Sequence, residues 1–409
     1  MFVNPDWAPG RAPGIATTEG ALFAVGAHAM AGPAGLDQVI AAFKRKEYRT
    51  AARLLNPLLQ SHGEDPWVQV YAARLHELSG KRAIAEPIYR KLLQNTTSPN
   101  PKILNLARQG LQRLEQADHA RRQGELAKVR QQVTGQGSQR NNALFVLEPL
   151  PEGGDRKTAA QSLSKIFDLD AYSARLQIPS REVRVYRLGP LAELKIYEQE
   201  LRSAGLPCFA VPLAEIHQTK VFQVRYLETV EPQITVVCEN ESGQMGRIQF
   251  GWNEVTSRAT GDLPLLSSVV DLDARGKLMR REQVQDFAQV MDLHLGDRRT
   301  ILRLVDSQYQ FDQGVDFVPV AFLEEKNHQQ VRPTRRTQWN AVTGFFDQQL
   351  PDAPARDQLD PFAATVSDRE DLLLDIKPHL HLARRHDNPI DAIFQLYSAL
   401  IAWRGMNGV

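Results

Sequence analysis

The feature that most constrains this 409-residue chain is an interval of 34 residues between two similar stretches, AARLLNPLL at residues 51–59 and AIAEPIYRKLL at residues 83–93. Ala51 and Ala85 occupy matching positions at that interval. Apolar residues recur at steps of three and four throughout residues 36–132, which predicts amphipathic helices. In a repeat of this length built from two helices, small alanines let the backbones approach while larger side chains fill the space between pairs. We therefore expect an array of antiparallel helix pairs.

The second of these units, WVQVYAARLHELSGKRAIAEPIYRKLL, resembles a tetratricopeptide repeat (TPR). Its residues at consensus positions are Ala73, Gly80, Ala85, Tyr89 and Leu93. The resemblance implies a helical array that holds a peptide or a helix of a partner protein, with a polar third unit acting as a cap. The first unit departs from the pattern, because Pro57 lies inside its second helix and removes a backbone hydrogen bond there. A helical bundle without repeats is the alternative.

Beyond residue 132 the pattern of apolar residues changes twice. The stretch TGQGSQRNN at residues 134–142 is polar and rich in helix breakers, which indicates a domain boundary. Strand-like and helix-like stretches then alternate, and from residue 221 onward period-two patterns predict β-strands separated by turns. The expected fold class is therefore multidomain α+β. The expected domains are a flexible N-terminal arm (1–35), TPR-like helical repeats (36–132), a linker (133–142), a ferredoxin-like α/β module (143–217), a β-rich domain (218–350) and a helical C-terminal tail (351–409).

The two domains after the linker resemble known architectures in topology. Two strand–helix–strand units in succession are similar to the ferredoxin-like fold. Antiparallel strands followed by the helical stretch TQWNAVTGFFDQQL resemble a pleckstrin-homology (PH) domain. The order of the three domains, together with the phrase DLHL, is similar to uncharacterised repeat proteins of photosynthetic bacteria, a likeness that assigns no activity. No Gly-rich phosphate loop follows a strand, so we interpret the α/β module as a structural or interaction module rather than a ligand site.

Composition and charge narrow the classes of function. The net charge of +1 gives no overall attraction to nucleic acid or membranes, so an electrostatic partner must meet a local patch. Cys208 and Cys238 lie in apolar runs, without a second cysteine at metal or redox spacing. No run reaches the ~18 apolar residues of a membrane span. The stretch ALFAVGAHAMA at residues 21–31 lacks the basic start of a signal peptide. We expect a cytoplasmic protein.

One stretch resembles a calcium site. Residues 271–282, DLDARGKLMRRE, are similar to an EF-hand loop, with Asp271, Asp273 and Glu282 at liganding positions. Arg275, however, puts a cation where an oxygen ligand belongs, and β-branched residues precede the loop where a helix should lie. A turn between two strands is the preferred interpretation.

No other pattern assigns chemistry. His379, His381 and His386 are potential metal ligands, but nothing in the sequence supplies the hydrogen-bonding partners that orient such ligands. Asp168 and Asp170 lack the preceding strand and following hydroxyl residue of an aspartyl nucleophile. There is no G-x-S-x-G elbow and no cysteine with a convincing partner histidine. We expect no metal and no cofactor; an enzyme with an unrecognised active site is a lesser alternative, because such sites can be assembled from distant residues.

The repeat pattern locates a candidate binding face. In a TPR the first helix of each pair lines the groove, which places Arg74 and Arg108 at equivalent positions. Glu77, Gln112 and Lys44 are expected beside them. Because a guanidinium can engage a carboxylate through two parallel bonds, we expect Arg74 and Arg108 to bind an extended acidic segment of a partner protein. The alternative is that both are ordinary solvated helix residues.

Two functions remain open. The leading one is a non-enzymatic adaptor, scaffold or assembly factor that binds a partner segment through the helical repeats. The alternative is a membrane-surface or anionic-ligand module, in which Lys277, Arg280 and Arg281 of the β-rich domain, with residues 332–336, contact the anion. Nucleic acid is disfavoured, because the basic third helical unit is interrupted by acidic residues and lacks aromatic side chains for base stacking.

Overall fold

The computed structural model describes residues 33–94, 100–133, 142–272, 278–318, 333–382, 384 and 388–407. For residues 267–272 and 279–282 it describes the backbone only. The chain divides into two compact units, Met1–Lys128 and Val129–Val409. The described residues form thirteen α-helices and two β-sheets, a mixed architecture that agrees with the expected α+β class. Most of the predicted N-terminal arm and linker lies outside the described residues.

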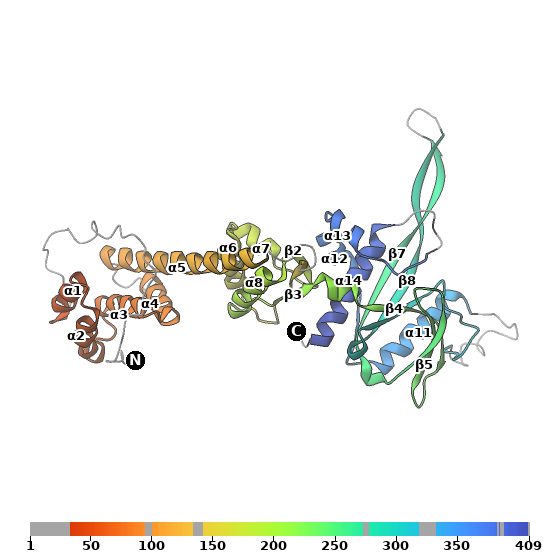
Figure 1. Ribbon diagram of the computed structural model, residues 1–409, viewed down its shortest axis with the longest axis horizontal. Helices are drawn as coiled ribbons and strands as arrows, with labels where there is room; N and C mark the ends of the chain where they lie inside the picture. The colour runs from red at the N-terminus through yellow and green to blue at the C-terminus, as the bar shows by residue number, and fades with distance from the viewer. Residues whose placement is uncertain are drawn as a thin grey trace. The chain divides into compact units, whose positions relative to one another are not determined.

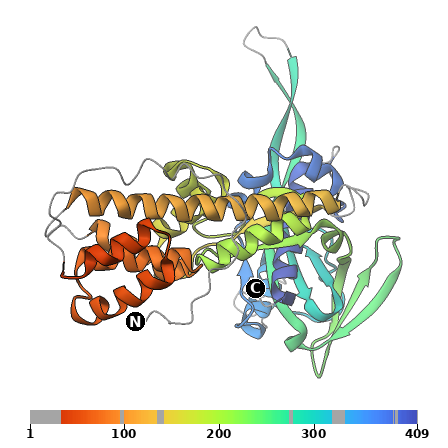
Figure 2. The same cartoon turned by 60° about the vertical axis from the view of Figure 1, so that its left-hand side comes forward.

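The N-terminal unit is entirely helical in the part that the structure describes. Figure 2 shows four short helices along the N-terminal part of one long helix. These are α1 (Leu36–Lys44), α2 (Tyr48–Ser61), α3 (Pro66–Leu78), α4 (Arg82–Gln94) and α5 (Pro101–Val133). Asp65 begins α3 by accepting backbone N–H bonds from Trp67 and Val68, and Pro66 follows it at the first helical position.

The 34-residue interval corresponds to core positions of this unit. Ala51, Ala85 and Leu55 are fully buried, and Tyr89 is only 1% exposed. One hydrophobic cluster joins them to residues of α1, α3 and α5. Pro57 and Pro87 lie inside α2 and α4 without ending either helix. Small residues at the close contacts and large ones between helices are the arrangement that the sequence predicted.

The C-terminal unit contains a three-stranded sheet of order β2-β1-β3, in which β1 is antiparallel to both neighbours. The strands β2 and β3 therefore run parallel to each other on either side of β1, and α8 connects them. The elements are β1 (Asn142–Leu147), α6 (Arg156–Phe167), α7 (Ala171–Gln177), β2 (Arg184–Pro190), α8 (Leu191–Ser203), β3 (Cys208–Pro212) and α9 (Leu213–His217). Asp170 caps α7 by accepting from the backbone of Tyr172 and Ser173, so this acid has a structural role.

The same unit contains a seven-stranded sheet of order β10-β7-β8-β9-β4-β5-β6. Neighbouring strands are antiparallel except β4 with β9 and β10 with β7. The strands are β4 (Lys220–Thr229), β5 (Ile234–Glu239), β6 (Met245–Phe250), β7 (Val255–Leu272), β8 (Leu278–Leu295), β9 (Thr300–Val305) and β10 (Ala355–Arg356). Short 3-10 helices, η1 (Trp252–Glu254) and η2 (Gly296–Arg298), precede β7 and β9. The sequence predicted strands from residue 221 onward and a turn between two strands at residues 271–282; β7 extends inward from that turn through Gly261 and Pro264.

The β7–β8 hairpin projects from the seven-stranded sheet as a two-stranded ribbon (Figure 1). The two strands pair from Val255 with Leu295 out to Leu272 with Leu278, and the register shifts between Val255 and Ser257 and between Leu265 and Leu266. Asp271 and Glu282, the first and last residues of the EF-hand-like stretch, therefore lie in paired strands and not beside helices. This arrangement supports the strand–turn–strand interpretation; residues 273–277 lie outside the described part of the chain.

Helices cover both faces of this sheet. The remaining helices are α11 (Arg335–Gln349), α12 (Leu359–Val366), α13 (Glu370–Asp375) and α14 (Pro389–Asn407). Trp339, Val342 and Phe346 of α11 are buried against one face. On the other face, α14 lies between the two sheets (Figure 1) and shares a core with both. The C-terminal helix α14 is buried from Asp391 to Trp403, so it is covered on all sides.

Candidate functional site

A largely buried carboxylate joins three helices of the N-terminal unit. Glu77 of α3 accepts hydrogen bonds from Tyr89 Oη of α4 at 2.9 Å and from Arg113 of α5, whose Nε and Nη2 lie 2.9 and 3.2 Å away. Arg74, nearly one turn earlier on α3, donates to the same carboxylate. The Glu77 side chain is only 11% exposed. Three donors thus compensate for the water that this carboxylate loses on folding.

A glycine makes this arrangement sterically allowed. A Cβ atom added to Gly110 of α5 would lie 2.3 Å from Cζ of Tyr89, closer than any real contact. The absence of a side chain at Gly110 therefore leaves room for the tyrosine ring between α4 and α5. The ring, 1% exposed, reaches Glu77 with its hydroxyl. Glu77, Arg74, Arg113 and Tyr89 are called the Glu77 cluster below.

The Glu77 cluster carries a net positive charge. Burial by itself raises the pKa of Glu77, but the hydrogen bond from Arg113 and the charges of Arg74 and Arg113 outweigh burial and lower the pKa. Glu77 is therefore ionised at neutral pH, and two guanidiniums face one carboxylate. A guanidinium has five N–H donors. Arg74 and Arg113 direct only one and two of these at Glu77, and their side chains remain 23% and 35% exposed.

The predicted groove residues fall into two groups. The structure brings Arg74 and Glu77 into direct contact within the chain, so neither is a simple solvated residue. Lys44, Arg108 and Gln112 are exposed at the ends or outer surface of α1 and α5. Arg113 was missed as a site residue, although it follows Glu77 by 36 residues, close to the repeat interval. Only the packing of α5 on α4 brings Arg113 to the same carboxylate as Arg74.

The helical unit is basic although the whole chain is nearly neutral. Residues 1–128 contain 17 Lys and Arg against 11 Asp and Glu, a net charge of +6, and the remainder contains 32 against 37, a net charge of −5. Several of the few carboxylates are already paired inside the unit. These ion pairs are Glu64 with Lys91, Glu86 with Arg90 and Asp118 with Arg82. The overall charge of +1 is therefore the sum of a positively charged helical unit and a negatively charged remainder.

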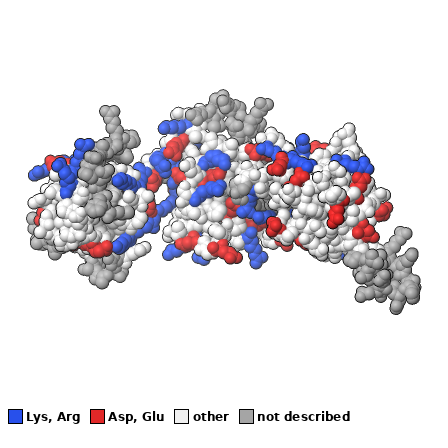
Figure 3. Space-filling view, turned by 90° about the horizontal axis from the view of Figure 1, so that it is seen from below, with Lys and Arg blue, Asp and Glu red and all other residues white. Residues whose placement is uncertain are grey.

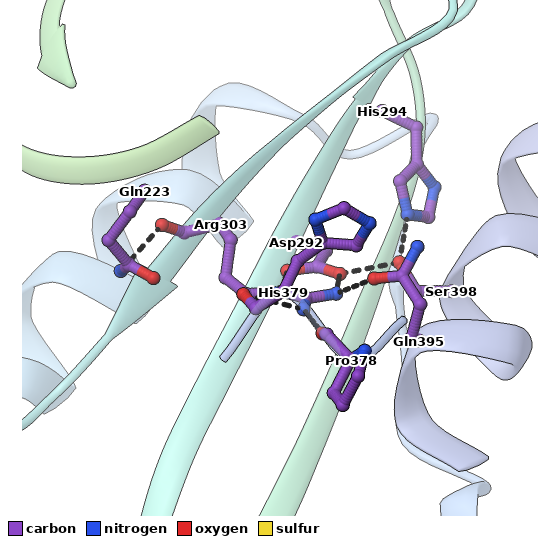
Figure 4. A network of polar contacts seen from close by, with 8 residues as sticks. All are labelled: Gln223, Asp292, His294, Arg303, Pro378, His379, Gln395 and Ser398. Carbon is purple, nitrogen blue, oxygen red and sulfur yellow. Dashed lines mark hydrogen bonds and ion pairs between the residues drawn. The ribbon is translucent and has the colours of Figure 1, made fainter. Parts of the chain in front are cut away.

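The C-terminal unit contains a second polar cluster, centred on a buried ion pair (Figure 4). Arg303 of β9 donates to both oxygens of Asp292 on β8, with Nε–Oδ1 and Nη2–Oδ2 distances of 2.9 and 2.7 Å. Both side chains are 0% exposed. Arg303 also donates to the Pro378 carbonyl at 2.7 Å and to Gln395 Oε1 of α14 at 2.9 Å. The guanidinium lies over the ring of Phe394, 5.0 Å from its centre.

A chain of hydroxyl and imidazole groups continues from Asp292. Ser398 of α14 donates to Asp292 and lies 2.9 Å from Nε2 of His294, whose Nδ1 lies 2.8 Å from Oγ of Ser257. Serine, histidine and aspartate are the groups of a nucleophilic triad. Here, however, His294 is 0% exposed and burial lowers its pKa to about 4. None of these residues lines either of the two pockets described in this part of the chain.

We therefore interpret the Asp292–Arg303 cluster as a structural connection. Its members come from β7, β8, β9, α14 and the segment around Pro378, and their polar atoms meet one another rather than an open surface. A buried ion pair that also hydrogen-bonds its surroundings restricts which packing arrangements are allowed. This cluster fixes α14 against the sheet.

The histidine stretch forms no metal site within the described residues. His379 has a left-handed backbone, with φ of 52°, so no helix places its neighbours on one face. Its Nδ1 lies 2.7 Å from Glu241 Oε1, and burial lowers its pKa to about 4. His381 is exposed, and residue 386 lies outside the described part. No group of three His, Cys, Asp or Glu residues that could hold a metal occurs among the described residues.

The basic contacts of the β-rich domain are only partly described. Arg280 and Arg281 lie on β8, where their backbones pair with Val270 and Val269 of β7. Lys277 and Arg332 lie outside the described residues. On the face shown in Figure 3, acidic and basic side chains are interspersed over the C-terminal unit. No described helix is long and apolar enough to cross a bilayer.

Comparison of the chain with protein-family models, curated proteins and solved structures finds no match. Function must therefore be argued from the geometry of the chain itself.

Proposed function

We propose that this protein is a non-enzymatic adaptor whose helical unit binds an acidic segment of a partner protein. The observation that carries the proposal is the Glu77 cluster, in which one buried carboxylate orients two partly exposed guanidiniums. Arginines held in this way have lost their conformational freedom before a ligand arrives, which reduces the entropy cost of binding. The net charge of +6 on residues 1–128 attracts an anionic partner at longer range.

The finer identities of the domains belong to the same proposal. The buried pair Ala51 and Ala85 at the 34-residue interval supports a TPR-like array. Two parallel strands separated by β1 and connected by α8 support a ferredoxin-like module, and a sheet covered by α11 supports a PH-like domain. Two buried thiols, Cys208 and Cys238, which form no disulfide, support a reducing, cytoplasmic location.

The acidic-segment proposal is tested by fluorescence anisotropy with the full chain and a fluorescein-labelled deca-glutamate peptide. We expect saturable binding that weakens as salt is raised, because the contacts are charged. The double variant Arg74→Gln with Arg113→Gln is expected to bind about tenfold more weakly, since the charge-assisted hydrogen bonds of both oriented guanidiniums are removed.

The matched control is Arg53→Gln, which removes an exposed positive charge from α2, away from the Glu77 cluster. It is expected to bind the peptide within about twofold of the wild type, because rim charges contribute little. Circular dichroism establishes that each variant is folded. Undiminished affinity in a folded double variant would remove the Glu77 cluster as the binding site.

A further inference from the structure

The β7–β8 hairpin extends well beyond the rest of its sheet (Figures 1 and 2). Strand β10 pairs with β7 only at Arg258 and Ala259, and β9 pairs with β8 only from Val290 onward. Among the described strands, the outer part of the hairpin therefore has no neighbouring strand on either edge. Residues 262–272 and 278–288 are called the arm below. The arm belongs to the C-terminal unit, so its role is independent of the function proposed for the helical unit.

One face of the arm is apolar. In the register of the hairpin, Phe287 lies opposite Pro264. The next such pair is Val284 with Leu266. Residues directly opposite each other in antiparallel strands share a face, as do residues two apart on one strand. These four residues therefore lie on one face, and an extra residue in β8, Gln285, explains the three-residue step between Val284 and Phe287.

This apolar face is exposed. Phe287 is 51% exposed and Val284 is 43% exposed. Leu278, which pairs with Leu272 six residues beyond Leu266 and so on the same face, is 77% exposed. These three are among seven large apolar side chains that are exposed in the described part of the chain. Because a ribbon of two strands is only marginally stable in water by itself, an exposed apolar face on one indicates an interaction surface.

The charge of the hairpin changes along its length. All four Lys and Arg residues of the stretch 259–290 lie at positions 275–281, whereas its Asp and Glu residues are spread along it. Two of the four, Arg280 and Arg281, belong to β8 near its outer end. At the base of the arm, Asp262 is exposed and lines one pocket with Asp357 and Asp360, which are also exposed. No ion pair joins these three acids to a Lys or Arg of the described chain, so the base is acidic.

We propose that the arm packs face to face on the arm of a second copy of this chain. In a two-fold symmetric dimer the same surface of each subunit meets itself. When the two arms are antiparallel, their apolar faces cover each other, and the basic outer end of each arm lies beside the acidic base of the other. The charges are then complementary at both ends of the interface. A second copy presents both the apolar face and the order of charges that the arm requires.

Sedimentation equilibrium of the full chain at a series of concentrations tests this proposal. We expect the average mass to rise with concentration from 46.0 kDa toward twice that value. Val284→Ser combined with Phe287→Ser should weaken dimerisation about tenfold, because burial of both apolar side chains is lost. The matched control is Leu374→Ser, which removes an 86% exposed leucine from α13, outside the arm. It should dimerise within about twofold of the wild type.

Two charge-reversed variants test the antiparallel arrangement. Arg280→Glu with Arg281→Glu makes the outer end of the arm acidic, and Asp262→Lys with Asp357→Lys makes its base basic. Each variant alone should dimerise about tenfold more weakly than the wild type, because like charges meet at both ends of the interface. An equimolar mixture of the two should recover dimerisation, because opposite charges meet again in the heterodimer.

Thermal unfolding of each variant establishes that it is folded. The proposal is overturned if the wild type keeps the mass of one chain at every concentration, or if the folded Val284→Ser, Phe287→Ser variant dimerises as well as Leu374→Ser. A mixture of the charge-reversed variants that stays monomeric overturns the antiparallel packing. A monomeric wild type that sediments with phosphatidylserine vesicles would assign the arm to a membrane surface instead.

Discussion

Gly110 of α5 lies directly against the ring of Tyr89 of α4, with 2.3 Å between the position of an added Cβ and Tyr89 Cζ. This contact determines how closely the two helices approach, and it places the tyrosine hydroxyl 2.9 Å from Glu77. The helical core and the candidate binding site therefore depend on the same glycine.

We expect Gly110→Ala to destabilise the protein by about 1–3 kcal/mol, because the new methyl group overpacks a filled space. Gly124 lies on the same helix, and a Cβ there meets nothing within 4 Å. Gly124→Ala is therefore expected to stabilise the protein by about 0.5–1 kcal/mol through helix propensity alone. Urea unfolding of both variants measures the difference. Equal effects of the two substitutions would contradict the close packing of α5 on α4.

Glu77→Gln should cost about 1–3 kcal/mol at pH 7, because it removes a charged acceptor of four hydrogen bonds. The folded-state pKa of Glu77 lies below its ordinary value of 4.5. The stabilisation is therefore fully present above pH 4.5 and is lost as the pH falls through the folded pKa. Urea unfolding across this pH range should show the wild type and the variant converging in acid.

The control for this comparison is Glu47→Gln, at an exposed position before α2 where the side chain makes no cap hydrogen bond. Its effect should stay within about 0.5 kcal/mol. A gap between wild type and Glu77→Gln that is the same in acid as at neutral pH would show that the carboxylate charge of Glu77 contributes nothing.

Asp292→Asn should destabilise the protein by about 3–5 kcal/mol, because it leaves the buried guanidinium of Arg303 without its countercharge. Asp297→Asn makes the same change at an exposed position in η2 and is expected to cost less than about 0.5 kcal/mol. Thermal and urea unfolding measure both. A loss below about 1 kcal/mol in Asp292→Asn would contradict the structural role of the Asp292–Arg303 cluster.

Neither cysteine should react with a thiol reagent in the folded protein. Burial raises the pKa of Cys208 to about 12 and that of Cys238 to about 11, so the reactive thiolate is scarce at pH 8. We expect no modification by a disulfide reagent in native buffer and two modified thiols per chain in urea. Rapid labelling of the native protein would show that one of the strands that contain Cys208 and Cys238 opens.

The sequence by itself determined local elements of the fold. Steps of three and four predicted helices on either side of Ala51 and Ala85, because the period of apolar residues records which side of an element faces the core. The period-two pattern beyond residue 221 predicted β-strands separated by turns. In the structure β8 and β9 pair across one such turn, which places Asp292 opposite Arg303.

Tertiary structure alone decided what covers those elements. Asp292 and Arg303 become a buried pair only because α14 packs over them with Gln395 and Ser398, about a hundred residues further along the chain. The strand before the turn at residues 271–282 was predicted, but its full length was not, because Gly261 and Pro264 weaken the local strand signal, which pairing with β8 overrides. Likewise, Arg113 joins Arg74 because α5 packs on α4. The period of apolar residues indicates which face of a helix or strand is buried. Which other helix or strand covers that face depends on contacts between residues far apart in the sequence.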